Sequence, residues 1–286
     1  MVIHPAVSKT ETEVAKKGRH KPFSFHDYAV SILIALVVAA VYGGYLFFFR
    51  RNYMFNAPPG VDSLYIPNKV IAGVGMLLLA FTFLIGPIYR YFDVFDYLLE
   101  YRKEIGIVGG FFAVIHPVVS YFFLPLKFPR SSIPFTSIEY GAGLAGTIVV
   151  IFLLIITFEK TKDLLGAKRW WFLHRFGLRL VILFTVIHLF YMRWSSWVGW
   201  VKHGSGKPSA ELLHPSVPGA TILASLFVAW VVIIRLYETI FLYKDLGLKP
   251  KEIAIDANLR LRGRRFFVYS FGVLIACYIF VFTRWM

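Results

Sequence analysis

The chain has 286 residues, of which 58% are hydrophobic and only 16% are charged, and its formal net charge at pH 7 is +15. Soluble globular domains carry about a quarter charged residues, so this composition, with a mean hydropathy of +0.65, excludes a soluble domain. We therefore expect an all-α polytopic membrane protein, a transmembrane helical bundle in contact with membrane lipid.

The apolar stretches of the chain are each long enough, or nearly so, to cross a hydrocarbon core of about 30 Å. The first follows a polar segment, residues 1–26, and ends in Phe49-Arg50-Arg51 without a small-residue cleavage site. We therefore expect it to remain as an anchor and not to be removed as a signal peptide. The seven predicted spans are residues 28–49, 70–89, 107–126, 140–158, 176–191, 219–234 with an expected extension to 243, and 266–282.

Basic residues gather on one side of the membrane in this topology. Of the 31 Lys and Arg residues, 22 fall in residues 1–27, 90–106, 159–179 and 235–265. The positive-inside rule then predicts a cytoplasmic N-terminus and an outer C-terminus, in a multi-pass protein of the cell membrane, the inner or plasma membrane. Topology and attraction to anionic lipid explain much of the positive charge, and no nucleic-acid-binding module is recognisable, so we expect no nucleic-acid partner.

Three histidines lie in or at the edge of these apolar stretches: His116 in the third, and His174 and His188 in the fifth. An imidazole in hydrocarbon is costly without a partner, so histidines at such positions indicate a functional role. His174 and His188 are 14 residues apart, which puts them on nearly the same helix face at depths about 21 Å apart. His116 and His188 lie at similar depths, roughly 15 and 20 Å from the inner surface, as the two axial ligands of one haem iron would.

The lone cysteine, Cys277, leaves no Cys-x-x-Cys-His motif, so a haem in this chain would be b-type and held by side-chain ligation alone. Small residues near the start of the fourth stretch, among them Gly141 and Gly143, would let a flat macrocycle lie against the backbone. Close helix packing explains these small residues equally well. The histidines could also simply hydrogen-bond across helices to a Ser, a Thr or a carbonyl group. These alternatives stay open at the level of the sequence.

Two runs of sequence are similar to those of a known family. Residues 101–106, Tyr-Arg-Lys-Glu-Ile-Gly, enter the stretch that holds His116, and residues 165–175, Leu-Gly-Ala-Lys-Arg-Trp-Trp-Phe-Leu-His-Arg, enter the stretch that holds His188. This pattern resembles the ferric reductase-like transmembrane domain. Within that superfamily it looks most like the haem-binding membrane subunits of the bacterial methionine-sulfoxide reductase system. The resemblance covers about residues 25–243, six of the seven spans.

The resemblance implies a membrane b-type cytochrome, the electron-transfer subunit of a membrane oxidoreductase. It would pass electrons from a quinol or flavoprotein donor to an acceptor on the opposite face, with a partner protein on the outer face or within a membrane complex. His116, His174 and His188 match the metal-ligating histidines of the family. The implied division of the chain is a cytoplasmic segment of residues 1–26, a haem-binding bundle of residues 27–243, and an inner basic segment plus an additional span in residues 244–286.

One departure from the family concerns the number of haems. Two-haem members carry a second histidine on the third span, but here Arg102 and Arg130 occupy the corresponding offsets from His116. One haem b is therefore expected, and a second would need a non-histidine partner for His174. Alternatively, His174 could hydrogen-bond a quinone or flavin at the inner surface among four cations, although ordinary anchoring at the inner face explains those cations equally well. The four cations are Lys168, Arg169, Arg175 and Arg179.

Other functions stay open from the sequence. The chain could be a structural or assembly subunit of a larger membrane redox complex without turnover of its own, which the additional C-terminal span favours. A transporter is disfavoured, because spans three to five lack midplane carboxylates and no inverted repeat is visible. The inner segments are too short for a flavin and dinucleotide domain, so we expect that neither NADH nor NADPH reduces the chain directly.

Overall fold

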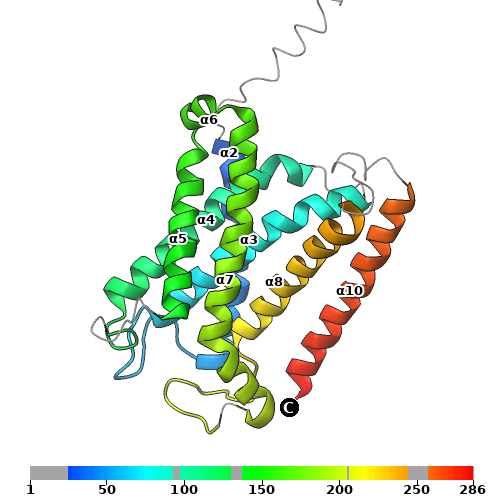
Figure 1. The fold of residues 1–286 in the computed structure, drawn as a ribbon. Coiled ribbons are helices and arrows are strands. Elements are labelled where there is room, and N and C mark those ends of the chain that lie inside the picture. Colours follow the sequence, from blue (N-terminus) through cyan, green and yellow to red (C-terminus); the bar gives the residue numbers. More distant parts are fainter. Residues whose placement is uncertain (1–24, 93–96, 130–136, 205, 244–256, 286) are drawn as a thin grey trace, which may run out of the picture.

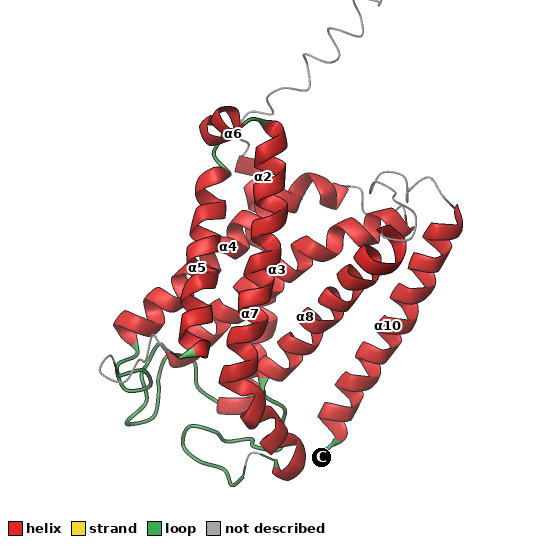
Figure 2. Cartoon of the chain, viewed as in Figure 1, coloured by secondary structure: helices red, strands yellow, loops and turns green. Residues whose placement is uncertain are grey.

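The computed structural model describes residues 25–92, 97–129, 137–204, 206–243 and 257–285 (Figure 1). Within these residues all regular structure is helical, which confirms the predicted all-α bundle (Figure 2). Seven helices are long and apolar enough to cross a membrane, so the chain is a multi-pass helical membrane protein. The helices are α2 (Phe25–Gly44), α3 (Tyr65–Phe92), α4 (Tyr97–Phe123), α5 (Ile138–Ile156), α6 (Glu159–Leu165), α7 (Ala167–His203), α8 (Ala220–Tyr237) and α10 (Ala257–Thr283), and the π-helical segments η1 (Tyr45–Arg51) and η3 (Glu238–Tyr243) continue α2 and α8.

The two ends of the bundle differ in what connects the helices. Residues 52–64, 124–129 and 206–219 lie at one end, which we call the loop end (Figure 1). The short helix α6 lies at the opposite end, which we call the α6 end. The segments predicted to be external thus gather at the loop end, whereas the basic stretch around α6 gathers at the other.

The central helix of the bundle is α3. Fully buried side chains such as Ile66, Val74 and Ile85 line it, and it packs against α2, α4, α8 and α10. A Cβ added at Gly75 would lie only 2.9 Å from the backbone nitrogen of Ala113, so glycine lets the backbones of α3 and α4 approach closely. Helices in lipid associate through such close packing, because apolar burial gives little driving force between them.

The outer surface of the bundle is strongly apolar. On α2, the side chains of Leu33, Val37 and Val41 are each more than half exposed. Apolar surface of this kind is costly in water and suits contact with lipid chains. The predicted contact with membrane lipid therefore agrees with the fold.

The helix α7 is much longer than the span predicted from hydropathy, residues 176–191. It has 37 residues, which corresponds to a length of about 55 Å against a hydrocarbon core of about 30 Å. Glycines with positive φ flank it, Gly166 at +74° and Gly204 at +70°, and no proline interrupts it. One continuous helix therefore carries His174 and His188.

The additional C-terminal span, α10, is an integral part of the bundle. It packs against α8 and α3, and the Nε1–H of Trp230 on α8 donates to Ser270 Oγ at 3.0 Å. Beyond the end of α10, the Nε1–H of Trp285 donates to the carbonyl of Trp200 near the end of α7 at 2.8 Å. Contacts along its length thus fix α10 to α3, α7 and α8.

A glycine in α10 provides a test of this packing. A Cβ added at Gly263 would overlap the ring of Tyr91, which is fully buried in α3. We expect Gly263→Ala to destabilise the protein by about 1–3 kcal/mol, because overpacking forces neighbouring groups to move, and to lower the thermal unfolding midpoint in detergent. The control is Gly272→Ala on the same helix, where nothing lies within 4 Å of the added Cβ. Equal unfolding midpoints for the two variants would contradict the packing of α10 on α3.

Candidate functional site

A closed hydrogen-bond network holds the imidazole of His116 on α4. The hydroxyl of Ser120 donates to the carbonyl of His116 at 2.9 Å, so Ser120 must accept from the Nδ2 amide of Asn68, 2.8 Å away. This orients Asn68 Oδ1 toward His116 Nδ1 at 3.1 Å. An amide oxygen only accepts, so Nδ1 carries the proton and Nε2 keeps its lone pair. Asn68 is only 2% exposed, and its amide is therefore committed to this arrangement.

A backbone carbonyl holds His188 on α7 in the same tautomer. The Nδ1 atom of His188 lies 2.7 Å from the carbonyl oxygen of Glu139, the second residue of α5. The carbonyl only accepts, so Nδ1 is the donor and Nε2 is again free. One turn along α5, a Cβ added at Gly143 would lie 2.9 Å from His188 Nδ1. The imidazole of His188 therefore rests against the backbone of α5 at a position where only glycine leaves room.

The two imidazoles share one region of the bundle near the loop end. Their partners Asn68 and Glu139 lie near the starts of α3 and α5, both at the loop end. The two imidazoles lie within electrostatic range of each other, and Arg193 lies within that range of both. Within the described residues α4 and α7 do not pack closely against each other, whereas α5 packs against both. A group ligated from both helices requires that α4 and α7 do not pack closely against each other.

His174 lies apart from this pair, toward the α6 end of α7. The Thr157 hydroxyl donates to the Leu153 carbonyl at 2.7 Å and so accepts from His174 Nε2, 3.3 Å away. The imidazole also packs on the ring of Trp170, with 4.1 Å between centroids. The Nε2 atom, which is free in His116 and His188, is thus occupied in His174 by the hydroxyl of Thr157. His174 has the cross-helix hydrogen bond that the sequence left open as an alternative.

Arg169 and Arg175, two of the four cations predicted to accompany His174, are exposed on the first turns of α7. The structure does not bring them to His116 and His188. Arg175 lies within electrostatic range of Arg102 on α4. Two-haem members of the family that the sequence resembles carry a second histidine at the position that Arg102 occupies relative to His116. The Nε–H of Arg102 donates to the Thr82 carbonyl at 3.0 Å.

A buried ion cluster near Arg102 was missed by the sequence analysis. Glu238, at the start of η3, is fully buried and pairs with both Arg90 and Arg235. The Nε–H of Arg90 donates to Glu238 Oε1 at 2.6 Å. The available signal was a lone carboxylate within the extension of the sixth apolar stretch, where an ionisable residue calls for a partner.

Among the described residues, no three His, Cys, Asp or Glu side chains come together as a metal-binding group. The two histidines whose Nε2 atoms are free inside the bundle are His116 and His188. Two neutral imidazoles suit a haem iron, whose porphyrin supplies the other ligands. The free Nε2 atoms, the glycine beside His188 and the nearby cation Arg193 all fit such a group.

No protein-family model matches this chain, and no curated protein sequence matches it significantly.

Proposed function

We propose that this membrane protein is a b-type cytochrome of the ferric reductase-like kind, in which His116 and His188 ligate one haem b through their Nε2 atoms. The haem would supply one-electron transfer between a quinol or flavoprotein donor and an acceptor on the opposite face. The family assignment rests on the sequence pattern around His116 and His174 to His188. The chain's own part is to hold and orient the two imidazoles.

The observation that carries this proposal is the shared tautomer of the two histidines. Metal-bound histidines nearly always donate their other ring nitrogen to a carbonyl or carboxylate, which fixes the ring and makes it a better ligand. His116 and His188 both make this bond, to Asn68 Oδ1 and to the Glu139 carbonyl. A histidine that serves only to bridge helices, such as His174, has no need of a free Nε2 atom.

The first test is the visible spectrum of the purified full-length protein, recorded oxidised and after reduction by a quinol or dithionite. We expect a low-spin b-type spectrum with one haem per chain, because His116 and His188 each keep a free Nε2 atom, whereas the Nε2 atom of His174 bonds Thr157. Two haems per chain would require a ligand partner for His174. A colourless protein, expressed in cells supplied with haem, would contradict the proposal and favour a structural or assembly subunit.

The direction of electron flow depends on orientation, for which the distribution of Lys and Arg predicts a cytoplasmic α6 end. We expect reporter fusions after Lys21 and within residues 249–265 to be cytoplasmic, and a fusion after Lys207 to be external. The check is alkaline phosphatase activity for external fusions and fluorescence of green fluorescent protein for internal ones. The reverse pattern would place the histidine pair near the inner surface and reverse the proposed path.

A further inference from the structure

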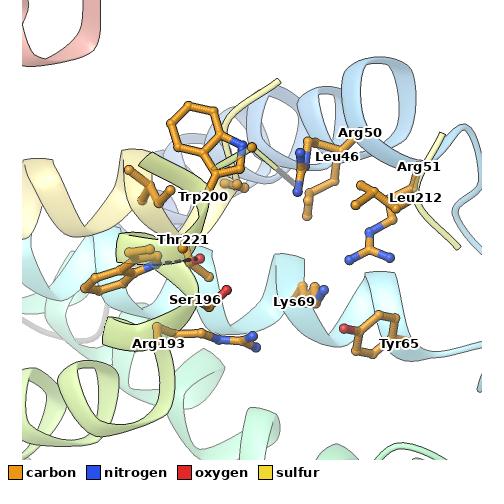
Figure 3. Close-up of a pocket in the computed structure, with 16 residues that line it drawn as sticks. Leu46, Arg50, Arg51, Tyr65, Lys69, Arg193, Ser196, Trp200, Leu212 and Thr221 are labelled. Atoms are coloured by element: carbon orange, nitrogen blue, oxygen red, sulfur yellow. Dashed lines mark hydrogen bonds between the residues drawn. The ribbon is translucent and has the colours of Figure 1, made fainter. Parts of the chain in front are cut away.

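The loop end of the bundle contains a cavity of about 420 Å³, lined by η1, α3, α7, α8 and the segment that joins α7 to α8. Four cationic side chains line it: Arg50, Arg51, Lys69 and Arg193 (Figure 3). Among the lining residues, all within the described chain, there is no Asp or Glu. The cavity therefore concentrates positive charge from three separate segments.

Two of these cations have protein partners. Arg50 donates to the carbonyls of His214, at 3.2 Å, and of Val217 in the loop between α7 and α8. Arg51 forms an ion pair of 2.7 Å with Glu211. Burial raises the pKa of Glu211, but the hydrogen bond from Arg51 and the surrounding positive charges outweigh it, so the pKa lies below its ordinary value. Glu211 is therefore ionised at neutral pH and compensates the charge of Arg51.

The side chains of the other two cations have no direct partner of this kind. Neither Lys69 nor Arg193 makes a hydrogen bond or ion pair within the part of the chain that the structure describes. Among the described residues, the Lys69 ammonium has a close contact with the ring of Tyr65, 3.9 Å from its centroid. Figure 3 shows Lys69 and Arg193 directed toward the same space. Cations in a partly enclosed site are costly without a counter-charge, and an anion in the cavity would supply it.

The walls of the cavity indicate the size and chemistry of the anion. Trp197 and Trp200 line it with apolar rings, and Ser196 adds a hydroxyl. A volume of this order accommodates a compact organic molecule or the charged part of a larger one. Arginine and lysine together favour oxygen anions, because guanidinium matches carboxylate or phosphate in a planar fork and ammonium acts as a point charge.

We infer that this cavity is an oxyanion-binding site, in which Lys69 and Arg193 hold carboxylate or phosphate groups. The site stands on the cavity alone and does not require the haem. It nevertheless adjoins the proposed haem site, since Lys69 follows Asn68 in α3 and Arg193 acts on both His116 and His188. The oxyanion can have two sources, which an experiment can distinguish. It is either a free anion that enters from the loop end, or the propionates of a haem bound to the histidine pair.

The test measures the thermal unfolding midpoint of the purified full-length protein against citrate and, separately, inorganic phosphate, each compared with sodium chloride at equal ionic strength. We expect a saturable rise in the midpoint. In Lys69→Gln and Arg193→Gln we expect an apparent Kd that is larger by about tenfold or more, the usual effect of losing a charged hydrogen bond. Lys202→Gln is the matched control, because Lys202 is exposed on the same end of α7.

Each outcome decides the inference. A response to citrate or phosphate that depends on Lys69 and Arg193 supports a free anion, and it would stand even if the protein proved to contain no haem. No response in the wild-type protein, with haem lost from the Lys69 and Arg193 variants but not from Lys202→Gln, supports haem propionates as the source. Equal behaviour of all three variants in both the anion titrations and haem retention would overturn the inference.

Discussion

Replacing His116 or His188 with alanine is expected to reduce the haem content of the purified protein by roughly tenfold or more. Each imidazole would supply one of two axial ligands, and even the loss of an outer-shell partner of a metal-bound histidine typically costs about 10–100-fold in affinity. Haem per chain, measured by the pyridine haemochrome method after purification, checks this expectation.

The controls separate ligation from folding. His203→Ala removes an exposed histidine at the end of the same helix as His188 and should leave haem content unchanged. His174→Ala should also retain the haem, since the Nε2 atom of His174 already bonds Thr157. Loss of haem in every histidine variant would show a general defect in folding, and full haem in both His116→Ala and His188→Ala would refute the assigned ligands.

The second large effect is expected at Glu238. This carboxylate is fully buried and faces two arginines, Arg90 and Arg235. Glu238→Gln keeps the shape but leaves two partly buried cations without a counter-charge, and breaking a buried pair in this way typically costs about 3–5 kcal/mol. We expect a clear fall in the thermal unfolding midpoint, with haem content per folded chain unchanged because the cluster is at the α6 end.

The matched control is the same substitution at the loop end, Glu211→Gln. Glu211 is about a third exposed, with 34% of its side chain accessible, and pairs of this kind contribute about 0–1 kcal/mol. Its pKa is lowered in the folded protein, so its contribution is present above the ordinary pKa of glutamate and is lost as the pH falls through the lowered value. At neutral pH the Glu211 variant should therefore unfold close to the wild type, and a larger loss than in Glu238→Gln would contradict the assigned burial.

The spans were predictable from sequence, but their ends were not. Hydropathy detects only the apolar part of a helix. It predicted the third span as residues 107–126, whereas the corresponding helix α4 begins at Tyr97. Charged residues such as Arg102 do not stop a helix when a neighbouring carbonyl, here that of Thr82, accepts their hydrogen bonds. The ends of α7 are set instead by Gly166 and Gly204, whose positive φ values do not continue a helix.

The candidate site could be predicted only in part. His116 and His188 stood out because a titratable group in an apolar stretch is rare. Their hydrogen-bond partners could not be predicted from the sequence. Every residue has a backbone carbonyl, so nothing distinguishes that of Glu139, and Asn68 lies 48 residues from His116. The cationic cavity was hidden for the same reason: Lys69 and Arg193 are brought together only by the packing of the helices.

Electron paramagnetic resonance of the oxidised full-length protein tests the ligation of haem by His116 and His188 most directly, because the ferric spectrum reports both axial ligands. We predict a low-spin signal of bis-imidazole type in the wild-type protein. In the fraction of His188→Ala that retains haem, it should convert to a high-spin signal, and added imidazole should restore the low-spin form. A wild-type spectrum without bis-imidazole ligation would contradict the ligation of haem by His116 and His188. An unchanged bis-imidazole signal in both His116→Ala and His188→Ala would contradict it as well.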